Sequence, residues 1–112
     1  MTAYEVVDAA LSVLVGNRAF ADVVPRGTRL PHIRFTTIGG RINTTLCDDG
    51  DVSELVQIDV STSTALERRQ LQAQVQAALK LAPRPCLQTS APVYFWDDEL
   101  DAYRVSLTYT MN

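Results

Sequence analysis

Few side chains in this sequence could carry chemistry, and its histidine is the first to consider. His32 is the only histidine, and it lies between Pro31 and Ile33 at the start of an expected strand. A catalytic histidine needs an acid that orients its ring and a reacting group within reach. No residue pattern identifies either, so we interpret His32 as a surface or strand-edge residue. We predict no catalytic residue in this chain.

Two acidic runs could offer oxygen ligands to a cation. They are residues 48–51 (Asp-Asp-Gly-Asp) and 97–101 (Asp-Asp-Glu-Leu-Asp). Neither follows an EF-hand, in which acidic positions alternate around a glycine and end in a distant glutamate. Residues 39–41 (Gly-Gly-Arg) also lack the Gly-Lys-Ser/Thr of a phosphate-binding P-loop. We therefore interpret both runs as solvated turns and predict neither a metal nor a cofactor.

Composition is that of an ordinary globular protein. The 112 residues are 46% hydrophobic and 21% charged, which fits a single domain over residues 1–112.

The net charge of -3 argues against a domain whose main function is to bind nucleic acid, since such domains usually carry a basic stripe. Arginines cluster between residues 26 and 41, and we interpret them as a solvated edge. Cys47 and Cys86 lack Cys-x-x-Cys spacing, and we expect free thiols.

No segment is typical of a membrane span or of a secretory signal. The longest apolar stretches are broken by polar residues and fall well short of the ~20 apolar residues that a span needs. Residues 1–5 (Met-Thr-Ala-Tyr-Glu) contain no basic region ahead of an apolar core. We expect a soluble protein that is assembled in the cytoplasm.

Two amphipathic helices are predicted from the spacing of apolar residues. In residues 3–15, apolar side chains recur at i, i+3, i+4 and i+7 from Val7 onward. The second helix runs from residue 65 to about 81, with Leu71 beginning its apolar face. Thr64 precedes Glu67 by three residues, which is the spacing of a capping box.

The remaining segments alternate as strands do. After a short extended piece near Phe20, β-type patterns cover residues 32–38, 41–46, 52–61, 88–96 and 102–111. Residues 37–52 are predicted to form a mobile hairpin arm, and the acidic run 97–101 joins the last two strands. The order of elements predicts an α+β fold, with an antiparallel β-sheet and two main helices packed on one face as a two-layer sandwich.

One predicted strand is apolar on both faces. Tyr94 and Trp96 share one face, while Val93 and Phe95 share the other. A two-layer domain covers only one face of its sheet, so a second subunit would cover the extra apolar face, and Trp and Tyr are favoured anchors at interfaces. The alternative is a central strand that lies under the second helix or under a folded-back loop.

Three segments together resemble a known family. They are residues 27–35 (Gly-Thr-Arg-Leu-Pro-His-Ile-Arg-Phe), 56–60 (Val-Gln-Ile-Asp-Val) and 103–109 (Tyr-Arg-Val-Ser-Leu-Thr-Tyr). In order and spacing they resemble the tail-completion or tail-to-head joining proteins of tailed phages, first catalogued as a domain of unknown function. The resemblance spans nearly the whole chain, although residues 37–52 depart from it in being polar.

The resemblance implies a structural virion protein that closes the end of the tail tube as a hexameric ring and joins it to the head. Its partners would be other copies of itself, the tail tube protein and neck or connector proteins, with no membrane. DNA would pass through the ring without specific binding. For the contact between subunits we predict Tyr94 and Trp96, together with Arg41, Asn43 and Thr45 in the arm.

Two other functions stay open at this point. A neck or head-completion adaptor would share the small α+β form but contact the portal side. A small binding module or an enzyme of unknown substrate would need a convergent polar pocket, for which the sequence offers no residue set.

Overall fold

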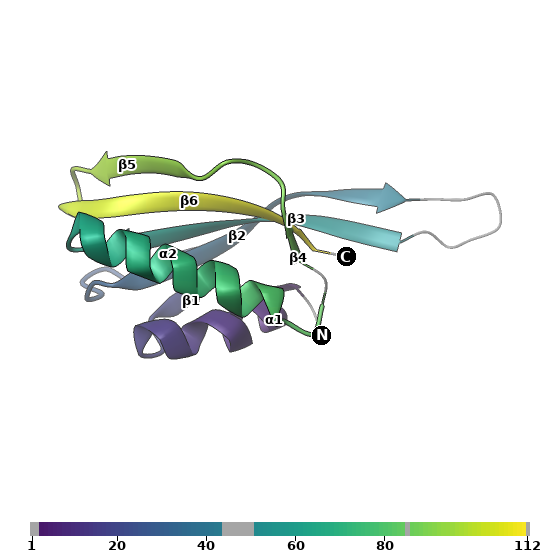
Figure 1. The fold of residues 1–112 in the computed structure, drawn as a ribbon, viewed down its shortest axis with the longest axis horizontal. Coiled ribbons are helices and arrows are strands. Elements are labelled where there is room, and N and C mark those ends of the chain that lie inside the picture. Colours follow the sequence, from purple (N-terminus) through teal and green to yellow (C-terminus); the bar gives the residue numbers. More distant parts are fainter. Residues whose placement is uncertain (1–2, 44–50, 85, 112) are drawn as a thin grey trace.

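The computed structural model describes residues 3–43, 51–84 and 86–111 (Figure 1). Within them, helices and strands follow one another in this order: α1 Ala3–Leu11, the 3₁₀ helix η1 Ser12–Val15, β1 Ala19–Ala21, β2 His32–Asn43, β3 Asp51–Thr62, α2 Ala65–Lys80, β4 Cys86–Gln88, β5 Val93–Asp97 and β6 Ala102–Met111. None of the described helices is long and apolar enough to cross a membrane.

The six strands form one sheet in the order β1-β2-β3-β6-β4, and β5 also pairs with β6. The α+β class is confirmed, and every pairing is antiparallel except that of β1 with β2, which is parallel. The strand predicted over residues 88–96 is in fact two short strands. β4 and β5 both lie against β6, and the segment between them contains Pro92, which has no N–H to donate to the ladder.

Local sequence signals mark where the first helix ends and where the second begins. The predicted helix over residues 3–15 is α1 followed by η1, and Gly16 stops it in the left-handed conformation, at φ 57° and ψ 44°. At the start of α2, the Thr64 side chain accepts a hydrogen bond from the Glu67 backbone N–H. Glu67 Oε1 in turn accepts from the Ser63 N–H at 3.1 Å. This is the predicted capping, with the return bond made one residue earlier.

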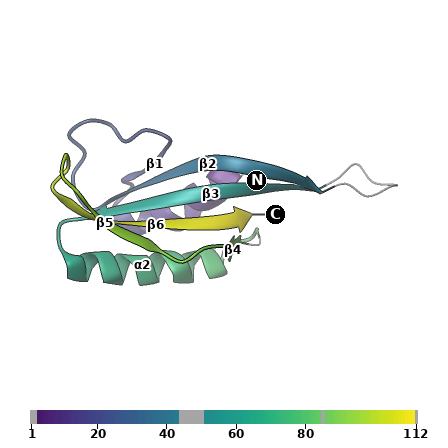
Figure 2. The same ribbon diagram turned by 90° about the horizontal axis from the view of Figure 1, so that it is seen from above.

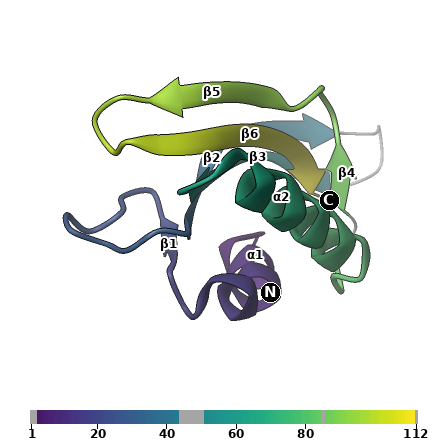
Figure 3. The same cartoon turned by 60° about the vertical axis from the view of Figure 1, so that its left-hand side comes forward.

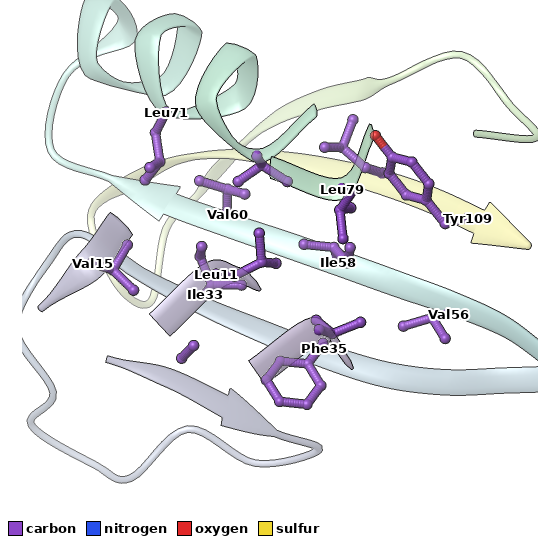
Figure 4. Packing of buried hydrophobic residues seen from close by; sticks show 14 of the residues in the cluster. Leu11, Val15, Ile33, Phe35, Val56, Ile58, Val60, Leu71, Leu79 and Tyr109 are labelled. Carbon is purple, nitrogen blue, oxygen red and sulfur yellow. The ribbon is translucent and has the colours of Figure 1, made fainter. Parts of the chain in front are cut away.

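The core lies between the two helices and one face of the sheet (Figures 3 and 4). Leu11 comes from α1, Leu79 from α2 and Ile58 from the middle of β3, and all are almost completely buried. The alternation of Tyr103 to Met111 turns one face of β6 toward the same core. Each such aliphatic side chain contributes about 1.5–3 kcal/mol by leaving water. The two-layer arrangement with helices on one face is confirmed.

The hairpin of β2 and β3 projects beyond the rest of the sheet (Figures 1 and 2). β1 covers only Ile33–Phe35 of β2, and the pairing of β3 with β6 stops at Glu54 and Met111. β2 and β3 continue to pair with each other as far as Asn43 and Asp51, after a register shift between Thr37 and Gly39. The strand pattern predicted over residues 41–46 therefore holds as far as Asn43, and the turn of the arm lies outside the described residues.

Candidate assembly surfaces

His32 is buried, which corrects its interpretation as a surface or strand-edge residue. It is 3% exposed, and it lines a depression together with residues 22–28, Arg34 and Arg104. Burial, Arg104 and Arg18 lower the pKa of its imidazole below the ordinary value. Its Nδ1 has no hydrogen-bond partner among the described residues. The ring thus lacks the orienting acid that a general base requires, and its surroundings favour a neutral side chain.

The sheet face opposite the helices holds a charged cluster. Arg34 Nη2 donates to Asp59 Oδ2 at 2.9 Å, and Arg104 Nη2 lies 3.5 Å from the same oxygen. Gln57 Nε2 also donates to this carboxylate, at 3.0 Å. Asp59 is only 2% exposed, so its charge is balanced by arginines rather than by water. Arg34, which the sequence placed on a solvated edge, is thus partly exposed and paired with a buried carboxylate.

The acidic turn after β5 is ordered by the chain itself. Asp97 Oδ1 accepts hydrogen bonds from the backbone N–H groups of Glu99 and Leu100, and its Oδ2 accepts from Arg104 Nη1 at 2.7 Å. The hydrogen bond from Arg104 is the main reason that the pKa of Asp97 is lowered. Asp97 therefore caps the turn and binds Arg104, while Asp98 and Glu99 are exposed, as predicted for a solvated turn.

A depression of about 430 Å³ separates that turn from the loop before β2. It is lined by His32, Arg34 and Arg104, by residues 22–28 and by Leu100. The lining mixes both signs of charge with apolar walls. It offers no set of residues arranged as acid, base and nucleophile.

β5 is an edge strand, and its apolar side chains are exposed on both faces. The exposed fractions are 59% for Val93, 52% for Tyr94, 39% for Phe95 and 46% for Trp96. β6 pairs with one edge of β5, and no other described strand pairs with it. The alternative of a central strand under the second helix is therefore wrong. The register with β6 puts Tyr94 and Trp96 on the helix side and Phe95 beside Arg104 on the other.

The two aromatic residues on the helix side are held in place. The Tyr94 hydroxyl donates to Gln72 Oε1 at 2.8 Å, and the Arg68 guanidinium lies 4.9 Å from the Tyr94 ring centre. Trp96 packs edge-on against Tyr103, with ring centres 5.0 Å apart. Rings that are fixed before binding lose little entropy when a partner covers them. The sequence predicted the aromatic face but not its arginine support from α2.

A basic depression lies where α2 meets Tyr94 of β5. It measures about 370 Å³ and is lined by residues of α2 and by Tyr94: Ala65, Arg68, Arg69 and Gln72. Farther along α2, Lys80 lies beside β4 in another depression. This face therefore presents positive charge next to exposed aromatic rings, which suits an acidic protein surface.

The other residues predicted at the interface belong to the arm. Arg41 and Asn43 lie in β2, where the backbone pairs with Ser53 and Asp51 of β3. Thr45 lies outside the described residues, as does Cys47. Cys86 is a free thiol, as predicted, and burial raises its pKa.

Comparison with known proteins identifies the family. The model of the family Tail completion protein gp17 matches residues 3–111. A solved chain of the virion of a native gene transfer agent (GTA) particle has the same fold, with a TM-score of 0.68 at 18% identity. The alignment covers 96% of this chain and 88% of that one. No curated protein matches the sequence. The chain belongs to the Tail completion protein gp17 family and is a structural protein of a phage virion.

Proposed function

We propose that this protein closes the end of a finished phage tail tube and joins the tail to the head, acting as a hexameric ring. The observation that carries the proposal is a pair of surfaces at different places on one small subunit. One is the apolar edge strand β5, and the other is the projecting β2–β3 hairpin. Family membership supplies the setting, because the matched family completes phage tails.

Two different surfaces favour a head-to-tail contact. When one surface of a subunit meets a different surface of the next, the assembly closes into a ring if the rotation per subunit divides a full turn. Tyr94 and Trp96 would lie on one side of this contact. Arg41, Asn43 and Thr45 of the next subunit would lie on the other side.

The ring has a structural role rather than a catalytic one, and DNA passes through it. The chain carries 13 acidic and 10 basic side chains, so its net charge of -3 disfavours tight association with phosphates. A fluorescently labelled duplex at low salt tests this point. Little binding is expected at micromolar protein, and tight binding would contradict free passage.

Co-purification separates the tube end from the neck. The tagged protein would be mixed, in separate samples, with tail tubes and with DNA-filled capsids of the same phage in a host-free buffer. We expect it to be recovered with the tubes, in six copies per tube end by native mass spectrometry of the released ring. Recovery with capsids alone would instead make it a head-completion adaptor, and recovery with neither would remove the proposed function.

The same experiment bears on where assembly takes place. We propose that the ring forms in the bacterial host cytoplasm, where tubes and capsids mature. Protein from lysed infected cells should therefore be bound to tubes before any virion is released.

A further inference from the structure

We propose that the outer edge of β5 pairs, as an antiparallel strand, with residues 39–43 of β2 from a second copy, so that one sheet continues from subunit to subunit. This inference rests on the proposed function, because it names the contact by which the copies in the ring join. The aromatic side chains would then flank an added strand rather than act as an isolated patch.

The first argument is that β5 lacks the devices that protect an edge strand. Exposed edges are usually guarded by charges, a proline, a bulge or a covering segment, because their free N–H and C=O groups invite another strand. Val93–Trp96 contains none of these, and its side chains are apolar on both faces. Asp97, at the end of β5, is already bound to Arg104. An edge of this kind is suited to strand addition.

The second argument is that the same chain carries a free edge of matching length. Ile33–Phe35 of β2 is covered by β1, and the Thr37 N–H donates to the Tyr4 hydroxyl at 3.1 Å. Beyond that point no described strand pairs with the outer edge of β2. Its inner edge stays paired with β3 as far as Asn43, so residues 39–43 are already extended. They equal Val93–Asp97 in length.

Glycine in the donor segment makes room for the aromatic side chains. A Cβ built on Gly39 would meet only Leu55 Cδ1, at 3.8 Å, so the space above this backbone is open. Glycine inside a strand weakens it and often marks a place where another backbone approaches closely. Gly39 therefore leaves open space beside the strand, next to which an aromatic ring of β5 can pack.

Charge selects the antiparallel direction. β5 leads into the acidic turn 97–101, and residues 39–43 lead into the acidic run 48–51. Parallel pairing would bring these two runs to the same end, where like charges repel. Antiparallel pairing puts the last residues of the two strands at opposite ends of the contact. It sets Gly39 opposite Asp97, residue 41 opposite Phe95, and Asn43 opposite Val93.

Cysteine cross-linking tests both partner and register. Arg41→Cys and Phe95→Cys would be made separately in a Cys47→Ser, Cys86→Ser background, and circular dichroism would check that each variant folds. Directly opposed residues of antiparallel strands have Cα atoms about 4.5–5.5 Å apart, within the range of a disulfide. The two variants would be mixed, allowed to assemble on tail tubes, oxidised and run on a non-reducing gel.

The expected result is a cross-linked dimer from the mixture and none from either variant alone. The matched control replaces Arg41→Cys with Ile42→Cys, which the proposed register sets opposite Tyr94 instead of Phe95, and it should give no dimer. A dimer from Phe95→Cys alone would mean that two β5 edges meet, which overturns the inference.

Imaging of the same samples separates the two proposals. If electron microscopy shows rings on the tube ends but the mixture gives no cross-link, the strand pairing is wrong and the proposed function stands. If no protein is found on the tube ends, the proposed function fails, and the inference fails with it.

Discussion

The helix-covered strands and the edge strand β5 both carry large apolar side chains but differ in what covers them. Val56, Ile58 and Val60 of β3 are completely buried by α1 and α2. Val93 and Trp96 of β5 keep about half of their surface exposed. The first set stabilises the subunit, because its burial is complete without a partner. The second set is available to stabilise an assembly.

This difference shows what an apolar pattern by itself can tell. Alternating hydrophobic residues predict which face of a strand is buried, but not whether the same chain or another one buries it. That depends on the position of the strand in the sheet, and hence on long-range pairing. The predictions below change one region while leaving the other intact.

The largest effect is expected in the covered region. Ile58→Ala removes a completely buried side chain between Phe35 and Leu107 of the neighbouring strands. We expect the free energy of unfolding to fall by about 2–5 kcal/mol, because a cavity is left in a packed core. Chemical denaturation followed by circular dichroism measures it. Val93→Ala on β5 is the control and should cost under about 1 kcal/mol, and equal losses would contradict the comparison.

The charged cluster should give the next largest effect. Asp59→Ala leaves Arg34 and Arg104 without the buried carboxylate that they share. The expected loss is about 2 kcal/mol, below the usual cost of breaking a buried pair, because Arg34 is partly exposed and Arg104 keeps Asp97. Asp98→Ala, in the exposed part of the acidic turn, should change the stability little. An unchanged unfolding midpoint for Asp59→Ala would show that solvent already screens the cluster.

A smaller effect should depend on pH. His32 has a lowered pKa in the folded state, mainly because it is buried. Below about pH 6.5 the imidazole takes up a proton in the unfolded chain, whereas in the folded chain it stays neutral. The free energy of unfolding therefore falls as the pH falls from there toward the folded pKa. The slope is at most about 1.4 kcal/mol per pH unit. His32→Gln should flatten the profile between pH 7.5 and 5.5, and an identical slope in both proteins would contradict this assignment.

Replacing Trp96 is expected to have the smallest effect on folding and the largest effect on assembly. Trp96→Ala loses a half-exposed ring and its edge contact with Tyr103, which costs the isolated subunit about 1 kcal/mol. Rings on tail tubes should disappear, because interface aromatics carry much of the binding free energy. Differential scanning calorimetry and counts of capped tube ends measure the two effects. A large fall in melting temperature would instead place Trp96 in the core.

Local signals in the sequence predicted most of the fold. The helix over residues 3–15, the cap at Thr64 and the alternation along β6 depend on neighbouring residues, and the structure confirms them. The parallel pairing of β1 with β2 was not predicted, because the relative direction of the two strands depends on the path of the long loop that joins them. The same limit explains His32, since Arg104, which lies near its ring, is far away in the sequence.

The candidate interface was predictable only in part. The aromatic face of β5 is visible from the alternation of Tyr94 and Trp96. Its support by Arg68 and Gln72 joins α2 to a strand 22 and more residues away in sequence, so no local pattern contains it. The exposed edge of β5 likewise follows from topology and not from composition.

The central claim is that this subunit forms a ring on the end of the tail tube through β5, and negative-stain electron microscopy of tubes mixed with the purified protein tests it most directly. Wild-type protein should place a ring on the tube ends and stop tube growth, while Trp96→Ala at the same concentration should leave the ends bare, as in a tube-only control. Bare ends with wild-type protein, or rings that form equally well with Trp96→Ala, would contradict the account.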